Sequence, residues 1–195
     1  MRFYREYKNT QIDRRGKDSK IIICKVWNIM DIKKLAVGYE IRELNKNDLD
    51  LIFNLSVGNH MFYEYCPPYV TKESIQNDMN ALPPGKRKED KFYVGYFDQE
   101  QLVAIMDFII KYPDEETVYI GLFMMEQKYQ GKGIGSKIIN EFSEYVNQLG
   151  FQHIQLAFAK GNSQSESFWL KNNFVKTGKE SENEGYIAVC MKRDL

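Results

Sequence analysis

A glycine-rich segment at residues 130–137, Gln-Gly-Lys-Gly-Ile-Gly-Ser-Lys, limits the possible folds of this chain more than any other feature. It stands between an apolar, strand-like run at residues 117–125 and an amphipathic, helix-like run that ends near Gly150. Because glycine lacks a Cβ atom, such a backbone turns sharply and lets an anion approach closely. The following helix adds N–H groups without intrahelical partners and the positive end of its dipole. The segment therefore predicts a phosphate-binding loop.

The spacing of the glycines separates three kinds of phosphate loop. Counted from Gly131, a nucleoside-triphosphate loop needs its second glycine where Ser136 stands. A dinucleotide-binding loop needs glycine or alanine at that same position, and the strand that follows lacks the acidic residue for a ribose. The third template, Gln/Arg-x-x-Gly-x-Gly/Ala, is satisfied by Gln130, Gly133 and Gly135. The simpler alternative is a surface loop that uses its glycines only for turning.

Together with Tyr129, this segment closely resembles motif A of the GNAT superfamily of acyl-CoA-dependent N-acetyltransferases. A second stretch, residues 162–174, ends in Phe-Trp-Leu-Lys-Asn-Asn-Phe and is similar to the family's other signature, roughly Asn-x-x-Ala-…-Phe-Tyr-x-Lys-x-Gly-Phe. The resemblance extends from about Val37 to the end of the chain and is strongest over residues 117–178. It implies an acyltransferase.

Two residues depart from the family's pattern. Asn173 replaces the glycine before the last Phe, and asparagine enters the left-handed conformation more readily than most residues. Trp169 stands where many members have a tyrosine. Since an indole cannot titrate usefully, Trp169 cannot replace a tyrosine in proton transfer, so we expect it to pack against the cofactor or the core.

The resemblance implies an α+β fold of three layers, α/β/α, around a mixed and mostly antiparallel sheet with one splayed strand pair. The residue pattern predicts the order β-α-α-β-β-β-α-β-α-β-β. It predicts helices at residues 47–56, from Thr71 to a stop at Pro83, at 134–149, and from a capping box at Ser163 and Glu166 to 172–173. The expected strands are residues 39–42, 92–97, 102–112, 117–125, 153–159, 175–179 and 186–192.

The chain divides into two parts by pattern. Residues 1–36 are predicted to be an N-terminal extension, for which a flexible tail is favoured over a functional arm, although residues 21–27 are strand-like. Residues 37–195 are predicted to form the acetyltransferase domain. The length of 195 residues suits one such domain.

In the family, the loop amides bind the pyrophosphate of coenzyme A, and the splayed strands bind its pantetheine arm. The resemblance therefore implies acetyl-CoA as the cofactor. A backbone amide near Met125 is expected to face the thioester carbonyl and stabilise its developing negative charge. The expected contacts are Phe123, Met124, Met125, Gln130, Gly131, Lys132, Gly133, Ile134, Gly135, Ser136, Asn162, Ser165, Phe168 and Trp169.

Acetyl transfer needs a neutral amine, so a base or a water relay must accept the ammonium proton, and an acid helps the thiolate to leave. Glu126 and Asp107 are the nearest carboxylates to the expected cleft, and for each the alternative is a solvated or structural role. The hydroxyl groups that remain as proton donors are Tyr129, Ser165, Ser167 and Tyr186.

Composition excludes other classes of function. Lysine and arginine equal aspartate and glutamate at 27 each, which argues against a nucleic-acid partner. No apolar run approaches the ~18 residues of a membrane span, and the N-terminus does not resemble a signal peptide. Three widely spaced cysteines predict reduced thiols in the cytoplasm and no metal site. The sequence leaves a homodimer open.

The function predicted from these residues is direct transfer of an acetyl group from acetyl-CoA to a primary amine of a small molecule or a peptide. The acceptor is expected to contact the aromatic joint at residues 58–69, whose tyrosine faces and Glu64 suit an amine. A packed helix connection is the alternative for this joint. An acyl-CoA-binding regulatory module with little catalysis is the alternative function.

Overall fold

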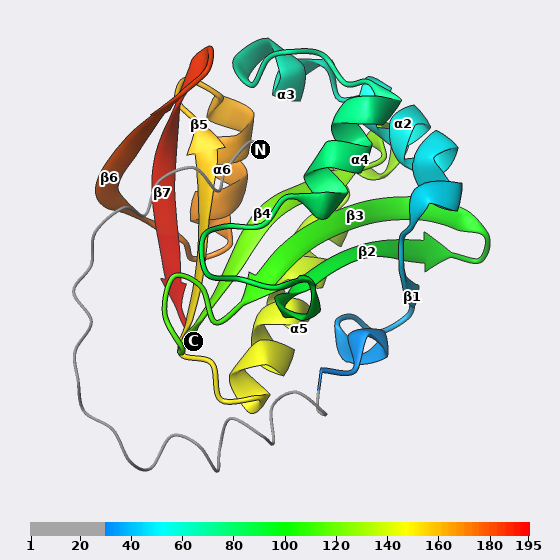
Figure 1. The fold of residues 1–195 in the computed structure, drawn as a ribbon. Coiled ribbons are helices and arrows are strands. Elements are labelled where there is room, and N and C mark those ends of the chain that lie inside the picture. The colour runs from blue at the N-terminus through cyan, green and yellow to red at the C-terminus, as the bar shows by residue number, and fades with distance from the viewer. Residues whose placement is uncertain (1–29) are drawn as a thin grey trace.

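The structure is a computed structural model, and it describes residues 30–195; the expected strand at residues 21–27 lies outside the described residues. Within that range, seven strands form one sheet in the order β1-β2-β3-β4-β5-β7-β6 (Figure 1). The strands are β1 (Glu40–Glu43), β2 (Lys91–Asp98), β3 (Gln101–Ile110), β4 (Thr117–Met125), β5 (His153–Ala159), β6 (Val175–Asn183) and β7 (Tyr186–Asp194).

Helices lie on both faces of this sheet. The α-helices are α2 (Leu49–Val57), α3 (His60–Tyr65), α4 (Lys72–Asn80), α5 (Ile134–Gln148) and α6 (Ser163–Lys171). Four short 3₁₀ turns accompany them in the described residues: η1 (Ile32–Lys34), η2 (Lys46–Asp48), η3 (Lys88–Asp90) and η4 (Gln127–Tyr129). The elements expected between residues 39 and 192 are present, but the joint at residues 58–69 contains α3, which the sequence pattern did not predict.

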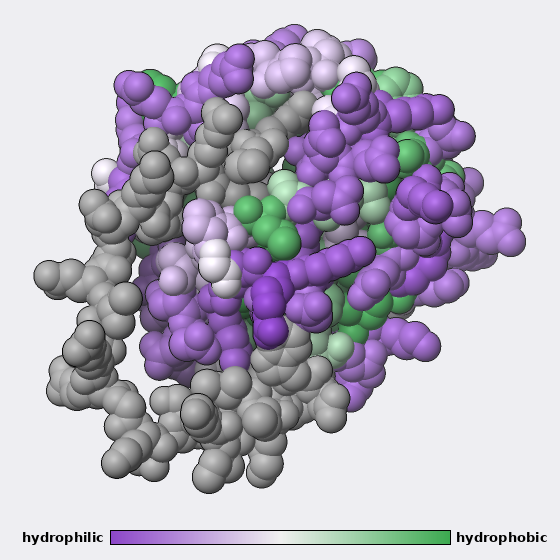
Figure 2. All heavy atoms as spheres, viewed as in Figure 1, coloured by the Kyte–Doolittle hydropathy of each residue, from purple (hydrophilic) through white to green (hydrophobic). Residues whose placement is uncertain are grey.

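Two large apolar clusters separate the layers. On one face, Phe142 of α5 and Trp169 of α6 belong to the same cluster as Phe108 of β3. On the other face, Ile52 of α2 and Ile75 of α4 pack in a second cluster with strand residues. Hydrophilic residues cover much of the outer side of α2 and α4 (Figure 2). The predicted three-layer α+β architecture is confirmed, because helices with one apolar side cover both faces of the sheet.

The only parallel contact of the described sheet joins β4 to β5, and all its other strand pairs are antiparallel. The pairing of β4 with β5 begins at Thr117 with His153 and stops at Ile120 with Leu156. Both strands continue past this point, β4 to Met125 and β5 to Ala159. The two strands therefore diverge at their carboxyl ends, as the resemblance predicted.

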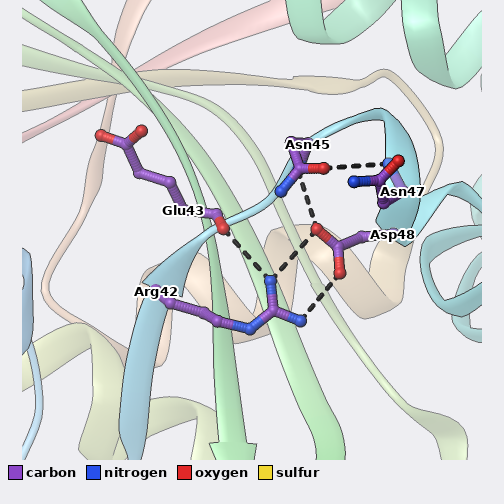
Figure 3. A network of polar contacts seen from close by, with 5 residues as sticks. All are labelled: Arg42, Glu43, Asn45, Asn47 and Asp48. Atoms are coloured by element: carbon purple, nitrogen blue, oxygen red, sulfur yellow. Dashed lines mark hydrogen bonds and ion pairs between the residues drawn. The ribbon is translucent and has the colours of Figure 1, made fainter.

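A charged fork fixes the joint between β1 and α2 (Figure 3). The guanidinium of Arg42 donates to both carboxylate oxygens of Asp48, at 2.8 and 3.1 Å, and Asp48 also accepts the backbone N–H of Asn45. The Asn45 side chain accepts in turn from the backbone of Asn47. The hydrogen bond from Arg42 holds the pKa of the Asp48 carboxyl below its usual value.

Candidate active site

The glycine loop enters α5 through two left-handed residues. Gly131 has φ of 71° and Gly133, the N-cap of α5, has φ of 79°. A Cβ atom at either position would meet no atom within 4 Å, so the loop backbone is open on that side. The first N–H groups of α5 have no intrahelical acceptor and follow directly. The loop therefore offers the arrangement that the sequence predicted for an anion.

Gly135 serves a different purpose from the other two glycines. A Cβ atom there would lie 2.7 Å from Sδ of Met125 and 3.2 Å from Cε2 of Phe168. The residue is buried in the first turn of α5. Its missing side chain lets α5 pack against the end of β4 and against α6, so the third glycine is needed for packing.

The side chains of Gln130 and Asn59 tie the loop to the end of β4. Nε2 of Gln130 donates to the Met125 carbonyl at 3.0 Å and to Oδ1 of Asn59 at 2.8 Å. Nδ2 of Asn59 donates to that same carbonyl at 3.0 Å and to the Leu55 carbonyl at 2.9 Å. The position of the loop is therefore linked to the α2–α3 joint, which the sequence did not reveal because Asn59 lies far away along the chain.

A cavity of about 340 Å³, here called the loop cavity, lies beside these residues. Its volume falls in the range of roughly 300–1,000 Å³ usual for small-molecule sites. The structure brings all the predicted cofactor residues to its wall except Lys132 and Ile134. None of the described acidic residues lines it, which suits an anionic ligand. The lining residues that sequence reasoning missed are Asn59, Phe62, Gln164 and Lys171.

A smaller cavity of about 50 Å³, the wedge cavity, lies where β4 and β5 diverge. It shares Phe123, Asn162 and Trp169 with the loop cavity. The N–H of Glu126 donates to the Val103 carbonyl on β3. Because neighbouring residues of a strand direct their backbone groups to opposite sides, the Met125 amide points to the β5 side of β4.

Asn162 is both a helix cap and a cavity residue. Its Oδ1 accepts from the backbone N–H of Ser165 at 2.9 Å, so it is the N-cap of α6. The predicted capping box at Ser163 is therefore wrong, because the helix begins one residue earlier than a Ser163 cap requires. Asn162 is 4% exposed and borders both the loop and wedge cavities. Asn162 can therefore cap α6 and contact a ligand at the same time.

Trp169 lies in an aromatic group between the core and the cavities. Its ring is 4.9 Å from that of Phe168, 5.1 Å from Phe174 and 6.2 Å from Phe123, centroid to centroid. The side chain is buried, yet it borders the loop and wedge cavities. Its position agrees with the expected packing against the core, and a contact with the cofactor stays a prediction. Asn173 has φ of 65°, as expected for a residue that replaces glycine.

The three candidate acid–base residues lie apart from one another. Asp107 is buried on β3, and its Oδ2 accepts from Nζ of Lys91 at 2.7 Å. Glu126 follows the last residue of β4, and Tyr186 opens β7 opposite Asn183. None of the three lines the loop or wedge cavity. Their catalytic roles stay predictions.

Lys91 is itself held by three acceptors. Besides Asp107, its ammonium donates to the carbonyl oxygens of Asp78 at 3.0 Å and Ala81 at 3.1 Å. Both charged side chains are about 95% buried or more, at 3% and 5% exposure. A third cavity of about 30 Å³, the inner cavity, lies between this ion pair and helices α2 to α4.

The model of the acetyltransferase (GNAT) family matches residues 57–174, and the chain belongs to this family. The protein is therefore an acyltransferase, and enzymes of this family use acetyl-CoA. Both predictions from the resemblance are confirmed. A search of the curated proteins found no match.

Solved structures share the fold at low identity. An acetyltransferase from Thermus thermophilus gives a TM-score of 0.63 at 17% identity, covering 82% of this chain and 99% of that one. A spermidine N-acetyltransferase from Vibrio cholerae, in complex with CoA and spermine, gives 0.60 at 20% identity, covering 80% and 95%. The ribosomal-protein-S18-alanine N-acetyltransferase from Escherichia coli gives 0.58 at 10% identity, covering 80% and 93%.

Among residues 30–195, no helix combines the length and apolar character that crossing a membrane requires. The same residues contain no group of three or more histidine, cysteine or acidic side chains arranged to hold a metal ion.

Proposed function

We propose that this protein transfers the acetyl group of acetyl-CoA to a primary amine by direct transfer in a ternary complex, through a domain formed by residues 37–195. One observation carries the proposal: the open glycine loop at the start of α5 and the diverging ends of β4 and β5 border two cavities that share lining residues, among them Phe123, Asn162 and Trp169. A pyrophosphate at the loop and a thioester in the wedge suit this arrangement.

The residues of the loop cavity fit coenzyme A. The backbone of Gly131 and Gly133 is open to an anion, and the helix dipole of α5 favours negative charge there. Lys171 adds a cation to the cavity wall. Phe123, Phe168 and Trp169 supply apolar surface for the pantetheine arm.

The chemistry proceeds by attack of a neutral amine on the thioester carbonyl. A C–N bond forms, the C–S bond breaks, and the electron pair leaves with the sulfur. Acetyl-CoA supplies the activated acetyl group, and the Met125 amide, on the β5 side of β4, stabilises the negative charge that develops on the carbonyl oxygen.

The amine proton leaves through water toward Glu126, which lies next to Met125 at the end of β4. Asp107 is a less suitable base because Lys91 already holds its carboxylate as a buried ion pair. The thiolate acquires a proton from solvent or a nearby hydroxyl, such as that of Ser165 on the cavity wall. Glu126→Gln should then lower the rate without changing acetyl-CoA affinity.

The first test is a thermal-shift comparison of acetyl-CoA, CoA, ATP and NAD. We expect a rise in melting temperature with the first two only. Thiol release from acetyl-CoA in the presence of a panel of amines then measures transfer. Binding of acetyl-CoA without amine-dependent thiol release would contradict the proposal and favour a binding module instead.

A further inference from the structure

The carbonyl of Met125 lies on the side of β4 from which β5 has diverged. The N–H of Glu126, in the same peptide group, donates to the Val103 carbonyl on β3 at 2.9 Å. Because the C=O and N–H of a trans peptide group point in opposite directions, the Met125 carbonyl points away from β3. The pairing of β4 with β5 has already stopped at Ile120, and Met125 is buried. A buried carbonyl in this place needs a donor from elsewhere in the fold.

Two side-chain amides supply that donor. Nδ2 of Asn59 and Nε2 of Gln130 each donate to the Met125 carbonyl at 3.0 Å, and Nε2 of Gln130 also donates to Oδ1 of Asn59 at 2.8 Å. These three hydrogen bonds form a closed ring. Together with the bond to Val103, they hold the peptide group between Met125 and Glu126 at both its oxygen and its nitrogen.

The position of Asn59 requires an amide. Its Nδ2 also donates to the Leu55 carbonyl at 2.9 Å, so the nitrogen faces two carbonyl oxygens while the oxygen faces the N–H of Gln130. An asparagine side chain has two N–H donors and one carbonyl acceptor, and this arrangement uses them all. An aspartate of the same shape would place an oxygen against the two carbonyls.

The backbone of Asn59 is fixed by two helices. Its N–H donates to the Ser56 carbonyl in α2 at 3.0 Å, and its own carbonyl accepts the N–H of Phe62 in α3 at 3.1 Å. Neither bond involves the glycine loop or the strands. The Asn59 side chain therefore holds Met125 from the α2–α3 joint, whereas Gln130 holds it from the loop.

This support determines the direction of the Met125 N–H. On an extended strand, the N–H and C=O of one residue point to the same side, so fixing the Met125 carbonyl also fixes its amide on the β5 side of β4. A donor stabilises a developing oxyanion only when it is aimed at the place where the charge appears. A small loss of alignment costs rate while it leaves the binding of the rest of the donor intact.

We infer that Asn59 is a positioning residue for acetyl transfer: through the Met125 carbonyl, it holds the Met125 N–H toward the thioester carbonyl. The inference rests on the proposed function and adds a residue to it that lies far from the glycine loop along the chain. Asn59 acts through Met125, so its removal affects the acetyl group of the donor and not the pyrophosphate end.

The first test is Asn59→Ala in the full chain, with thiol release followed in a single turnover at saturating acetyl-CoA and amine. We expect the rate to fall roughly 10- to 100-fold and the Kd for CoA, which has no acetyl carbonyl, to stay within about twofold. Asn80→Ala is the matched control. Nδ2 of Asn80 donates to the carbonyl four residues earlier, that of Gln76 at 2.8 Å, as Asn59 does at the end of α2. This control should leave the rate unchanged.

A spectroscopic readout separates positioning from a merely structural role. Acetyl-CoA labelled with ¹³C at the acetyl carbonyl is bound without amine, and its carbonyl stretch is measured by infrared difference spectroscopy. In the unmodified protein the frequency should lie below that of free acetyl-CoA, because the Met125 N–H polarises the carbonyl. In Asn59→Ala it should return most of the way to the free value. A single-turnover rate within twofold of the unmodified protein, or a slower rate with an unchanged carbonyl frequency, overturns the inference.

Gln130→Met is the second variant, and it decides the matter if Asn59→Ala does not fold. It removes the other donor to Met125 and should also lower the single-turnover rate and raise the carbonyl frequency; an unchanged rate and frequency overturn the inference. Absence of amine-dependent thiol release in the unmodified protein overturns the proposed function instead. In that case the infrared shift, which needs no amine, still decides whether Asn59 orients the Met125 amide.

Discussion

The loop cavity and the inner cavity are built from the chain in different ways. Apart from Asn59 and Phe62, the loop cavity is lined by residues between 123 and 171 and uses the backbone of a glycine loop. The inner cavity takes residues from α2, α3, α4 and three strands, between 56 and 122. The first kind of site follows from residue spacing, whereas the second depends on how distant elements pack.

The largest effect is expected from the buried ion pair beside the inner cavity. Lys91→Met leaves the Asp107 carboxylate buried without its cation and removes two bonds to carbonyls at the end of α4, so stability should fall by about 3–5 kcal/mol. Urea unfolding measures this loss. Lys88→Met at an exposed position is the control and should change little.

A double variant sharpens this result. Lys91→Met combined with Asp107→Leu removes both charges and should recover a large part of the lost stability. If Lys91→Met costs less than about 1 kcal/mol, the pair contributes little, and Asp107 becomes available again as a base.

Gly133 and Gly135 of the loop should respond differently to substitution. Gly135→Val drives a side chain into Met125 and Phe168 and should cost about 3 kcal/mol, with loss of acetyl-CoA binding as those residues shift into the loop cavity. Gly133→Ala meets no neighbour and carries only the cost of its left-handed backbone, about 1 kcal/mol. For each variant, thermal unfolding measures the stability and titration calorimetry measures the binding of acetyl-CoA. Equal loss of stability in the two variants would refute the packing role of Gly135.

The fork between Arg42 and Asp48 should make stability depend on pH. The pKa of Asp48 is lower in the folded than in the unfolded protein. Its contribution to folding stability is therefore present above the unfolded pKa of about 3.9 and is lost as pH falls through the folded pKa. Asp48→Asn should therefore cost about 2 kcal/mol at pH 7 and progressively less below pH 4. Urea unfolding of the variant and the unmodified protein, measured from pH 7 to below pH 4, tests this pH dependence. Asp50→Asn, at a 76% exposed side chain, is the control; a pH-independent cost for Asp48→Asn would contradict the assignment.

Much of the fold follows from the sequence where apolar runs have clear ends. The strands expected at residues 117–125 and 153–159 match β4 and β5 at both bounds, since polar turns enclose each run. The left-handed conformation of Asn173 agrees with what the resemblance implied, because Asn173 stands where the family signature has glycine. Most of the other predicted helix and strand ends differ from the observed ends by one or two residues.

The missed features depend on contacts between distant residues. Helix α3 has six residues, too few for a periodic pattern, and its Tyr65 packs against Gly161 on the far side of the wedge. The pairing of Asp107 with Lys91 follows from the neighbouring positions of β2 and β3, which no spacing reveals. Asn59, between α2 and α3, likewise contacts Met125 only because the folded chain brings these distant residues together. The sequence therefore predicts the residues of the loop cavity better than those of the inner cavity.

The smallest expected effect separates the two roles of Asn162. Loss of its cap on Ser165 should cost about 1 kcal/mol of stability in Asn162→Ala. Because Asn162 also borders the loop and wedge cavities, KM for acetyl-CoA should rise while KM for the amine stays constant. Asn45→Ala is a matched control, since Asn45 caps a 3₁₀ turn far from the loop and should lower stability without changing either KM. A loss of stability in Asn162→Ala with unchanged KM for acetyl-CoA would reduce Asn162 to a helix cap and leave the backbone of the glycine loop as the main anchor of the donor.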